Sequence, residues 1–302
     1  MKALVMRSTG SQYDVLTETG QRLVCRARGK LRLKGYKESN PVAVGDFVEI
    51  DLKAGLITEV HERKNHIVRK SVKKTGHVHV LAANIDQAVL MVTLVKPATS
   101  TGFIDRFMVT AEAFGIPQAL LFNKQDILDD AGRELQETLI RIYSNLNIAC
   151  LKISATTGDL NGVKSLLHGK TSLIAGLSGV GKSSLLNRLS PEINQPVGEI
   201  SDYSNKGMHT TTFAEMFKTD AHTFVIDTPG VKEWGLVNIT PEELSDYFPE
   251  MRVLRSTCRF GYRCRHINEP GCAVRQALNA GAISASRYAS YISMLEDDDN
   301  RR

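Results

Sequence analysis

Gly176-Leu-Ser-Gly-Val-Gly-Lys182-Ser183 is the stretch of this 302-residue chain that decides its fold. It fits GxxxxGK[ST], a phosphate-binding loop, and it stands between the apolar run 172–175 and a helical segment whose inward residues are Leu185, Leu186 and Leu189. Glycines let backbone N–H groups curl around phosphate oxygens, and the helix N-terminus adds its dipole. We expect Lys182 to reach the β- and γ-phosphates and Ser183 to hold Mg²⁺. The residues expected to contact nucleotide here are Gly176, Leu177, Ser178, Gly179, Val180, Gly181, Lys182, Ser183 and Ser184.

The sequence around this loop alternates between buried strands and amphipathic helices. Apolar runs occur at 88–95, 117–124, 148–155 and 223–230. Two helices are expected between them, with these apolar residues facing inward: Ile104, Phe107, Met108 and Ala111 in a helix that begins near Asp105, and Leu135, Leu139, Ile142 and Leu146 in the next. This alternation predicts a parallel sheet that is covered on both faces.

A second motif indicates which base is bound. Asn123-Lys124-Gln125-Asp126 follows an apolar strand, so it lies at a carboxyl edge of the sheet, and it fits NKxD. The Asp126 carboxylate can accept hydrogen bonds from N1–H and the exocyclic amine of guanine, a pair that adenine does not offer. Ser154 and Ala155, after the next strand, match the loop that supports guanine. An ATP-driven factor is therefore disfavoured.

Two further segments are candidates for switches. Asp227-Thr-Pro-Gly230 fits DxxG, so Asp227 is expected to bind Mg²⁺ through water and the Gly230 N–H to sense the γ-phosphate. In Gly207-Met-His-Thr-Thr-Thr212, Thr211 is the expected Mg²⁺ ligand, with Thr210 and Thr212 left open. Val231 stands where a water-orienting glutamine is usual, so either hydrolysis is slow or another group substitutes. His209 is a candidate for that group; the alternative is a solvated loop histidine.

The order of these motifs predicts a circularly permuted GTPase domain. In ordinary GTPases the phosphate loop comes first and NKxD comes late, whereas here residues 123–126 and 154–155 precede the loop at 176. Permutation is tolerated because chain ends lie at the surface and near each other. The chain that leaves DxxG passes directly into the C-terminal part.

The N-terminal 75 residues have another character. They read as five short strands punctuated by glycines, which predicts a small closed barrel of the OB-fold kind. They carry 16 basic and 8 acidic residues, a net charge of +8, against −3 for residues 76–235 with 13 basic and 16 acidic residues. A basic barrel favours contact with RNA, although solvated surface charge is the alternative.

Near the C-terminus, four metal-ligating side chains fall within fifteen residues: Cys258, Cys264, His266 and Cys272. Three thiolates and one imidazole suit a tetrahedral structural Zn²⁺. The surrounding part is expected to be mainly helical. Residues 251–290 contain seven arginines and one acid, Glu269, so this part is expected to face phosphates. Cys25 and Cys150 sit in strand-like runs and are expected in the core.

Composition excludes several other classes of protein. The longest apolar run is too short to cross a bilayer, and the first ten residues contain no secretory segment. Five cysteines do not make a disulfide scaffold. A soluble, cytoplasmic protein with no membrane partner is expected.

Together these residues resemble the ribosome small-subunit-dependent GTPase A family. NKQD, GLSGVGKS, HTTT, DTPG followed by an apolar residue, and CRHINEPGC look like that family's motifs across nearly the whole chain. The resemblance implies a GTP hydrolase that binds the small ribosomal subunit and its rRNA, acts in late assembly of that subunit, and is stimulated by it. It also implies a cytoplasmic bacterial monomer that binds GTP and GDP, with Mg²⁺ and one structural Zn²⁺.

The expected organisation is a multidomain protein: an OB-fold RNA-binding barrel at 1–75, a circularly permuted α/β P-loop GTPase domain at 76–238, and a mainly helical zinc-binding domain at 239–302. Two functions compete with the leading interpretation. One is a permuted GTPase that acts on the large subunit, and the other is a nucleotide-gated rRNA-binding switch with little hydrolysis, which Val231 keeps open.

Overall fold

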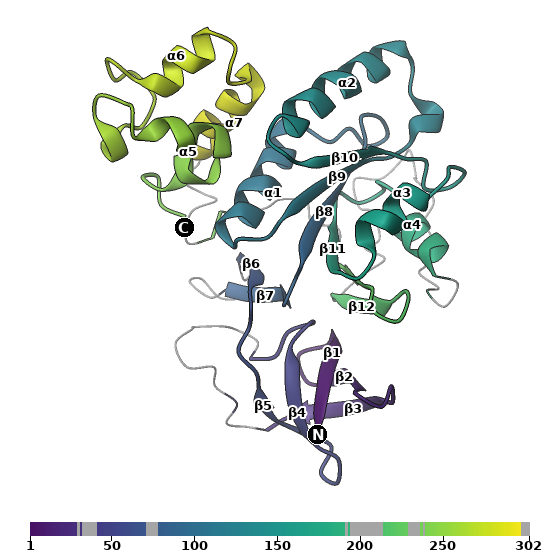
Figure 1. Cartoon of the computed structure of the whole chain (residues 1–302). Coiled ribbons are helices and arrows are strands. Elements are labelled where there is room, and N and C mark those ends of the chain that lie inside the picture. Colours follow the sequence, from purple (N-terminus) through teal and green to yellow (C-terminus); the bar gives the residue numbers. More distant parts are fainter. Residues whose placement is uncertain are drawn as a thin grey trace.

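The computed structural model describes residues 1–28, 31, 41–70, 78–190, 193, 214–228, 236–237 and 239–296. Three parts follow one another along the chain: a small barrel, a sheet flanked by helices, and a group of C-terminal helices (Figure 1). The expected fold class, an OB-like barrel, an α/β GTPase domain and a helical C-terminal part, is confirmed.

The N-terminal barrel is a closed ring of five strands. Its strands are β1 (Lys2–Ser8), β2 (Tyr13–Thr17), β3 (Arg22–Ala27), β4 (Phe47–Asp51) and β5 (Leu56–Val60). β1 pairs with both β2 and β4, β3 runs parallel to β5, and β4 and β5 are antiparallel, so no strand is left unpaired. Side chains from alternate positions, among them Val5, Val15 and Ile57, fill the interior because successive side chains of a strand point to opposite faces. Cys25 lies in this core, as expected.

The GTPase sheet continues from the barrel. Its strand order is β10-β9-β8-β11-β13-β12, and β12 pairs with β1 at Glu215 and Arg7. All its strands are parallel except β12, which is antiparallel to β13. The bounds are β8 (Gln87–Val92), β9 (Gln118–Phe122), β10 (Ala149–Lys152), β11 (Thr171–Ala175), β12 (Glu215–Lys218) and β13 (Phe224–Asp227).

Helices cover both faces of this sheet, as the alternating sequence predicts. α1 (Thr101–Ala113) and α2 (Asp130–Ser144) pack with Leu90 of β8 on one face. α3 (Asn161–Leu167) and α4 (Lys182–Leu189) pack with Val89 and Met91 on the other. β8 is buried at every position because its successive side chains pack alternately into the hydrophobic cores on the two faces of the sheet.

Two details of these helices differ from the expectation. α1 begins at Thr101 rather than near Asp105, because the Ser100 side chain caps the backbone N–H of Phe103. On α2, Leu135 is 50% exposed. Leu139 is buried as expected, together with Gln136 and Tyr143, and Ile142 and Leu146 pack against the same core.

A two-stranded hairpin connects the barrel to the GTPase sheet. β6 (His66–Lys70) pairs with β7 (Val78–Ala83), so the expected boundary at residue 75 falls between its strands. The segment before β4 reaches this hairpin through a parallel bridge between Val44 and Ala82. Gly45 makes the close approach possible: its φ is +89°, and a Cβ there would lie 2.1 Å from the Ala83 carbonyl oxygen.

The C-terminal part is helical. Its elements are the 3₁₀ turns η2 (Leu244–Tyr247) and η3 (Gly261–Arg263) and the helices α5 (Pro249–Arg255), α6 (Ala273–Asn279) and α7 (Ala285–Glu296). Its core includes Phe248, Met251, Tyr291 and Val109 of α1, so these helices pack on the GTPase sheet's outer helix (Figure 1).

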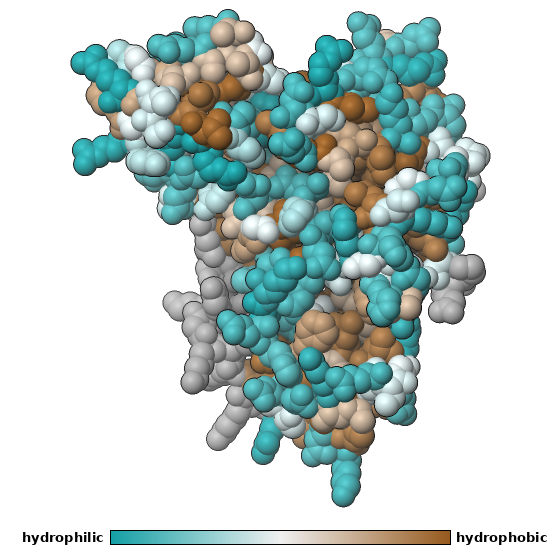
Figure 2. Space-filling model, in the orientation of Figure 1, coloured by the Kyte–Doolittle hydropathy of each residue, from teal (hydrophilic) through white to brown (hydrophobic). Residues whose placement is uncertain are grey.

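Figure 2 shows the hydropathy of one face of the molecule. The face in Figure 2 is mostly hydrophilic, with hydrophobic residues gathered in separate patches over each of the three parts. None of the helices in the described part of the chain combines the length and hydropathy needed to cross a bilayer.

Candidate nucleotide and metal sites

The phosphate loop connects β11 to α4 and depends on glycine at two positions. Gly176 has a φ of +152°, and a Cβ there would lie 2.7 Å from the Met91 carbonyl oxygen. Gly181 has a φ of +101°, and its Cβ would lie 2.4 Å from Nδ2 of Asn123. A larger residue at either position would displace β8 or the NKxD segment, so glycine is required for both backbone conformation and space.

Lys182 is buried at the start of α4 and folds back over this loop. Its Nζ donates hydrogen bonds to the carbonyl oxygens of Gly176 at 2.9 Å and Leu177 at 3.0 Å. Burial lowers the pKa of Lys182, and the nearby carboxylate of Asp227 opposes that shift. The ammonium therefore already occupies the mouth of the loop, where phosphate oxygens could replace the two carbonyls as its partners.

Asn123 joins three of the motifs. Its Nδ2 donates to the Val180 carbonyl oxygen in the phosphate loop at 2.7 Å, and its Oδ1 accepts from the Ala155 backbone N–H at 2.8 Å. NKxD, Ser154-Ala155 and the phosphate loop are separated by up to 57 residues in sequence but meet at one sheet edge. This is the edge where open α/β sheets bind ligands.

Asp126 of the NKxD segment is turned toward solvent, whereas Lys124 is partly buried. Asp126 is exposed in the 3₁₀ turn η1 (Gln125–Ile127), so its carboxylate is accessible to a base. Lys124 has a positive φ of 67°, and its Nζ donates to the Lys96 carbonyl oxygen. Burial lowers the pKa of Lys124. Its stem thus lies between the base-reading segment and the loop after β8.

Two elements of the site carry no motif. The loop after β8 reaches the phosphate loop, with Pro97 3.6 Å from the position of a Cβ on Gly179. Arg188 of α4 donates from Nη1 to the Ala155 carbonyl oxygen at 3.1 Å and from Nη2 to that of Gly158 at 2.9 Å. Arg188 therefore binds carbonyl groups of this loop, whereas Asn123 accepts from its Ala155 N–H. In sequence it is one arginine on a helix, indistinguishable from a solvated one.

Asp227 ends β13 next to the phosphate loop and is buried. The following Thr228 hydroxyl donates to the Ile174 carbonyl oxygen of β11 at 3.1 Å, which fixes the two strand ends together. Ser183 lies in the first turn of α4, and Ser184 follows it. The hydroxyl and the carboxylate are hard oxygen donors of the kind that Mg²⁺ prefers. His209, Thr210, Thr211, Thr212, Gly230 and Val231 lie outside the described residues.

The C-terminal part brings together all four expected metal ligands. The ligand atoms of Cys258, Cys264, His266 and Cys272 lie within 4.8 Å of one another, and all four residues are buried. His266 Nδ1 is 3.7 Å from the Cys258 sulfur and 3.4 Å from the Cys272 sulfur, and those sulfurs are 4.0 Å apart. Tetrahedral coordination with bonds of about 2.3 Å to sulfur and 2.0 Å to nitrogen separates ligand atoms by about 3.5–3.8 Å. The group can therefore hold one metal ion.

Burial has opposite consequences for the protonation of the cysteines and the histidine of this group. Burial raises the pKa of Cys264 to about 12 and also raises that of Cys272. Burial lowers the pKa of His266, which keeps the imidazole neutral and able to coordinate. Backbone N–H groups of Ala273 and Arg275 donate to the sulfurs of Cys258 and Cys272. Binding of a metal would release the thiol protons, after which these donors would stabilise the thiolates.

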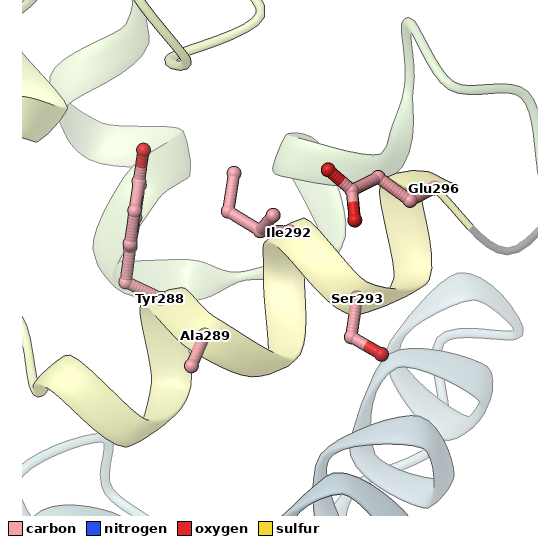
Figure 3. A pocket seen from close by; sticks show the side chains of 5 residues that line it. All are labelled: Tyr288, Ala289, Ile292, Ser293 and Glu296. Atoms are coloured by element: carbon pink, nitrogen blue, oxygen red, sulfur yellow. The ribbon is translucent and has the colours of Figure 1, made fainter.

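A hollow of about 600 Å³ lies elsewhere, along α7. Tyr288 and Ile292 project from this helix on one side, and Ala289, Ser293 and Glu296 complete the lining (Figure 3). One helix supplies every lining residue, with a single carboxylate, so the hollow lacks the convergent polar groups of a ligand site.

Comparisons with known proteins match the chain over its length. A family model described as RsgA GTPase matches residues 60–237, and one described as RsgA N-terminal domain matches residues 2–57. A curated protein named small ribosomal subunit biogenesis GTPase RsgA, from Bacteroides fragilis, is 47% identical over 301 residues, which cover 98% of this chain and 97% of the relative. A relative of the same name from Flavobacterium johnsoniae is 45% identical, with 99% and 94% covered.

Two solved structures have a similar fold. The crystal structure of YjeQ from Thermotoga maritima has a TM-score of 0.78 and 36% identity, and the match covers 100% of this chain and 99% of that one. YloQ, described as a circularly permuted GTPase, has a TM-score of 0.71 and 29% identity, with 97% and 93% covered.

Proposed function

The chain belongs to the RsgA GTPase family, and on that premise we propose that this GTPase acts in late assembly of the small ribosomal subunit, which binds it and stimulates its turnover. The curated relatives are named for small ribosomal subunit biogenesis. The observation that carries the nucleotide-binding part of the proposal is the position of Asn123, which links the phosphate loop to the Ser154-Ala155 loop. One amide thereby connects recognition of the phosphates to recognition of the base.

The residues take these roles in the proposal. Asp126 selects guanine, with Asn123, Lys124, Ser154 and Ala155 around the base. Lys182 and the backbone of residues 176–184 hold the phosphates. Ser183 and Thr211 would hold Mg²⁺, Asp227 would bind it through water, and the Gly230 N–H would meet the γ-phosphate. Bound Mg²⁺ supplies neutralisation of charge on the phosphate oxygens.

Orientation of the attacking water is the step for which the chain lacks the usual residue. The Val231 side chain has no polar atom with which to hold water. His209, in the segment before the switch threonines, is the proposed substitute. Turnover is accordingly slow in the free protein, and binding to the small subunit brings the water-orienting group into position.

The two flanking parts supply the RNA contacts. The barrel lies within the N-terminal segment of net charge +8, and six arginines between 252 and 275 surround the metal ligands. The division at 1–75, 76–238 and 239–302 assigns one role to each part: RNA binding, nucleotide hydrolysis and a second RNA contact. The metal is a single structural Zn²⁺, because all four ligands come from the protein and three are thiolates. The protein works as a cytoplasmic monomer.

The experiment is phosphate release from GTP and from ATP, measured with the protein alone, with small subunits and with large subunits. We expect slow GTP turnover that only small subunits accelerate. Acceleration of turnover by large subunits alone would show that the partner is the large subunit and not the small one. No acceleration by either would make the protein a nucleotide-gated RNA-binding switch.

An Asp126→Asn variant tests the assignment of the base. Loss of the carboxylate removes the acceptor for N1–H and the amine of guanine, so GTP affinity should fall by at least about tenfold. The amide can instead donate to the 2-oxo group of xanthine, so affinity for xanthosine triphosphate should rise. Titration with fluorescent nucleotides measures both. Unchanged preference would contradict the role of Asp126, and Gln125→Asn serves as a control in the same turn.

A further inference from the structure

The loop between the first two metal ligands exposes two aromatic side chains. It has the sequence Arg259-Phe260-Gly261-Tyr262-Arg263 and lies between α5 and α6. Phe260 is 47% exposed and Tyr262 is 71% exposed. Burial of a large aromatic side chain is normally favourable, so two exposed rings in one five-residue loop point to a partner with apolar, planar groups.

The Tyr262 ring is held in a fixed position. The Arg255 guanidinium lies 5.2 Å from its centroid and donates to the Tyr262 carbonyl oxygen at 2.7 Å. Arg255 is itself buried, with a second hydrogen bond to the Glu242 carbonyl oxygen and an ion pair with Asp246. A buried cation thus backs the ring, which remains largely open to solvent. Such a surface is pre-organised for stacking, because little conformational freedom is lost on binding.

The Phe260 ring has the same kind of neighbour. The Arg259 guanidinium lies 5.8 Å from its centroid, and the backbone N–H of Arg259 donates to the Gly271 carbonyl oxygen at 3.0 Å. The cysteines at both ends of the loop belong to the candidate metal site, so a bound ion would anchor the loop on either side.

The charge around these rings is positive. Arg259, Arg263 and Arg265 are exposed, and the structure gives none of them an ion pair within the described part of the chain. Glu269, the one acid of residues 251–290, accepts hydrogen bonds from the backbone N–H groups of Arg265, Ile267 and Asn268. The partner must therefore combine negative charge with exposed planar faces. Unpaired nucleotides do so, whereas bases in a duplex are already stacked on their neighbours.

We propose that Phe260 and Tyr262 stack on unpaired bases of RNA while the flanking arginines contact its phosphates. This rests on the proposed function, since it specifies the chemistry of the RNA contact made by the C-terminal part. Stacking tolerates any base, so the loop selects unpaired RNA over duplex rather than one sequence over another.

The test uses the full-length, zinc-loaded protein and two probes: a single-stranded RNA oligonucleotide of mixed sequence, and the same sequence in a duplex. Phe260→Leu and Tyr262→Leu each remove a ring but keep an apolar side chain. We expect each to weaken binding of the single strand by roughly tenfold, because a base–aromatic stack contributes about that much. Duplex binding and the salt dependence of the single-strand affinity should not change.

Three further variants make the result specific. Tyr262→Phe keeps the ring and should bind like the parent. Arg263→Gln should reduce the slope of log affinity against log salt concentration by roughly one. Val253→Ser removes another exposed apolar side chain of the same region and should have no effect. One equivalent of bound zinc and an unchanged melting temperature will show that each variant is folded.

Several outcomes would overturn the proposal. One is that the leucine variants lose affinity equally for duplex and single-stranded RNA. Another is that Val253→Ser loses as much single-strand affinity as they do, which would indicate an apolar protein-docking surface. The third is unchanged single-strand affinity in both leucine variants. Failure of the proposed function would be seen separately: small subunits would then not accelerate GTP turnover by the parent protein, whatever result the RNA probes give.

Discussion

The barrel and the C-terminal helices are attached to the same GTPase sheet by different kinds of contact. The barrel is joined through main-chain groups in addition to apolar contacts such as those of Met6 and Val44: β1 pairs with β12, and the Ala83 N–H donates to the Val44 carbonyl oxygen at 2.8 Å. The C-terminal helices are joined through a buried cluster of charged side chains in addition to their apolar core.

Arg287 of α7 is the centre of that cluster and is 2% exposed. Its Nη1 donates to Asp105 of α1 at 2.8 Å, and Nε and Nη2 donate to Glu250 of α5 at 2.8 and 3.1 Å. The Tyr143 hydroxyl of α2 donates to the same Asp105 oxygen, and the Phe248 ring lies 4.6 Å from the guanidinium. Main-chain pairing tolerates most substitutions, whereas a buried ion cluster fails when one member is lost. The barrel junction should therefore be robust and the C-terminal junction fragile.

Removal of the metal should give the largest effect, confined to the C-terminal side. The Tyr288 and Tyr291 hydroxyls donate to the carbonyl oxygens of His266 and Arg265, so the metal-site loop holds α7, which carries Arg287. Structural Zn²⁺ contributes about 10–16 kcal/mol in small sites. After chelation we expect hydrogen exchange to lose protection across α5–α7 while β1 and β8 stay protected. Equal loss of protection in the barrel would show that the two junctions are not independent.

Arg287→Met should come next. It leaves Asp105 and Glu250 buried without their cation, which costs about 3–5 kcal/mol. Denaturant unfolding followed by near-UV circular dichroism measures the loss. Arg252→Gln is the matched control, because Arg252 pairs with Glu112 across the same junction but is exposed, so its loss should cost less than about 1 kcal/mol. Similar losses in both variants would mean that apolar packing, rather than the buried cluster, holds this junction.

Gly45→Ala probes the weak point of the barrel junction. The new Cβ would meet the Ala83 carbonyl oxygen at 2.1 Å, in addition to an unfavourable positive φ. We expect a loss of about 2–4 kcal/mol in the free energy of unfolding. Gly20→Ala has a similar φ of +82° with no atom within 4 Å, so it isolates the backbone cost of about 1–2 kcal/mol. If thermal melts show the same loss of stability in both variants, the close approach at Gly45 adds no cost to that of the backbone conformation.

Glu215→Gln should give the smallest effect. Burial raises the pKa of Glu215 where β12 meets β1, although Arg7 opposes the shift. A carboxyl whose pKa is raised on folding binds its proton more tightly in the folded state. The stability that this carboxyl contributes to the protein is therefore lost as the pH rises from about 4 through the pKa of the folded state. The variant should lack this pH dependence. Its free energy of unfolding at pH 7 should rise by less than about 1 kcal/mol, since solvent screens a half-buried group. Unfolding curves at pH 4 and pH 7 test the sign.

The fold was predictable where the sequence is locally consistent. The apolar strands, the phosphate loop and the four metal ligands are each read from fewer than twenty residues, and their positions follow from hydrophobic period and ligand spacing. Of the residues expected to face inward around α2, only Leu135 was wrong: it is 50% exposed while its neighbour Gln136 is buried, which a hydrophobic period does not register. The start of α1 was missed although Ser100 is a standard capping residue.

The residues that sequence reasoning did not find act at long range. Arg287 and Asp105 are 182 positions apart, and Arg188 reaches carbonyl groups about 30 residues away. No local pattern distinguishes these arginines from solvated ones. Only the packing of α7 on α1, and of α4 beside the Ser154-Ala155 loop, gives them their partners.

The pairing of β1 with β12 also has a consequence for aggregation. An open sheet presents two edges to which another chain can add a strand. Here one end of the sheet runs into a closed ring, so among the described strands the large sheet has a single free edge, β10. That strand is only four residues long, and its Lys152 pairs with Glu137. Two copies that joined edge to edge through β10 would each use that edge, so among the described strands such pairing would stop at two copies while the barrel remains closed.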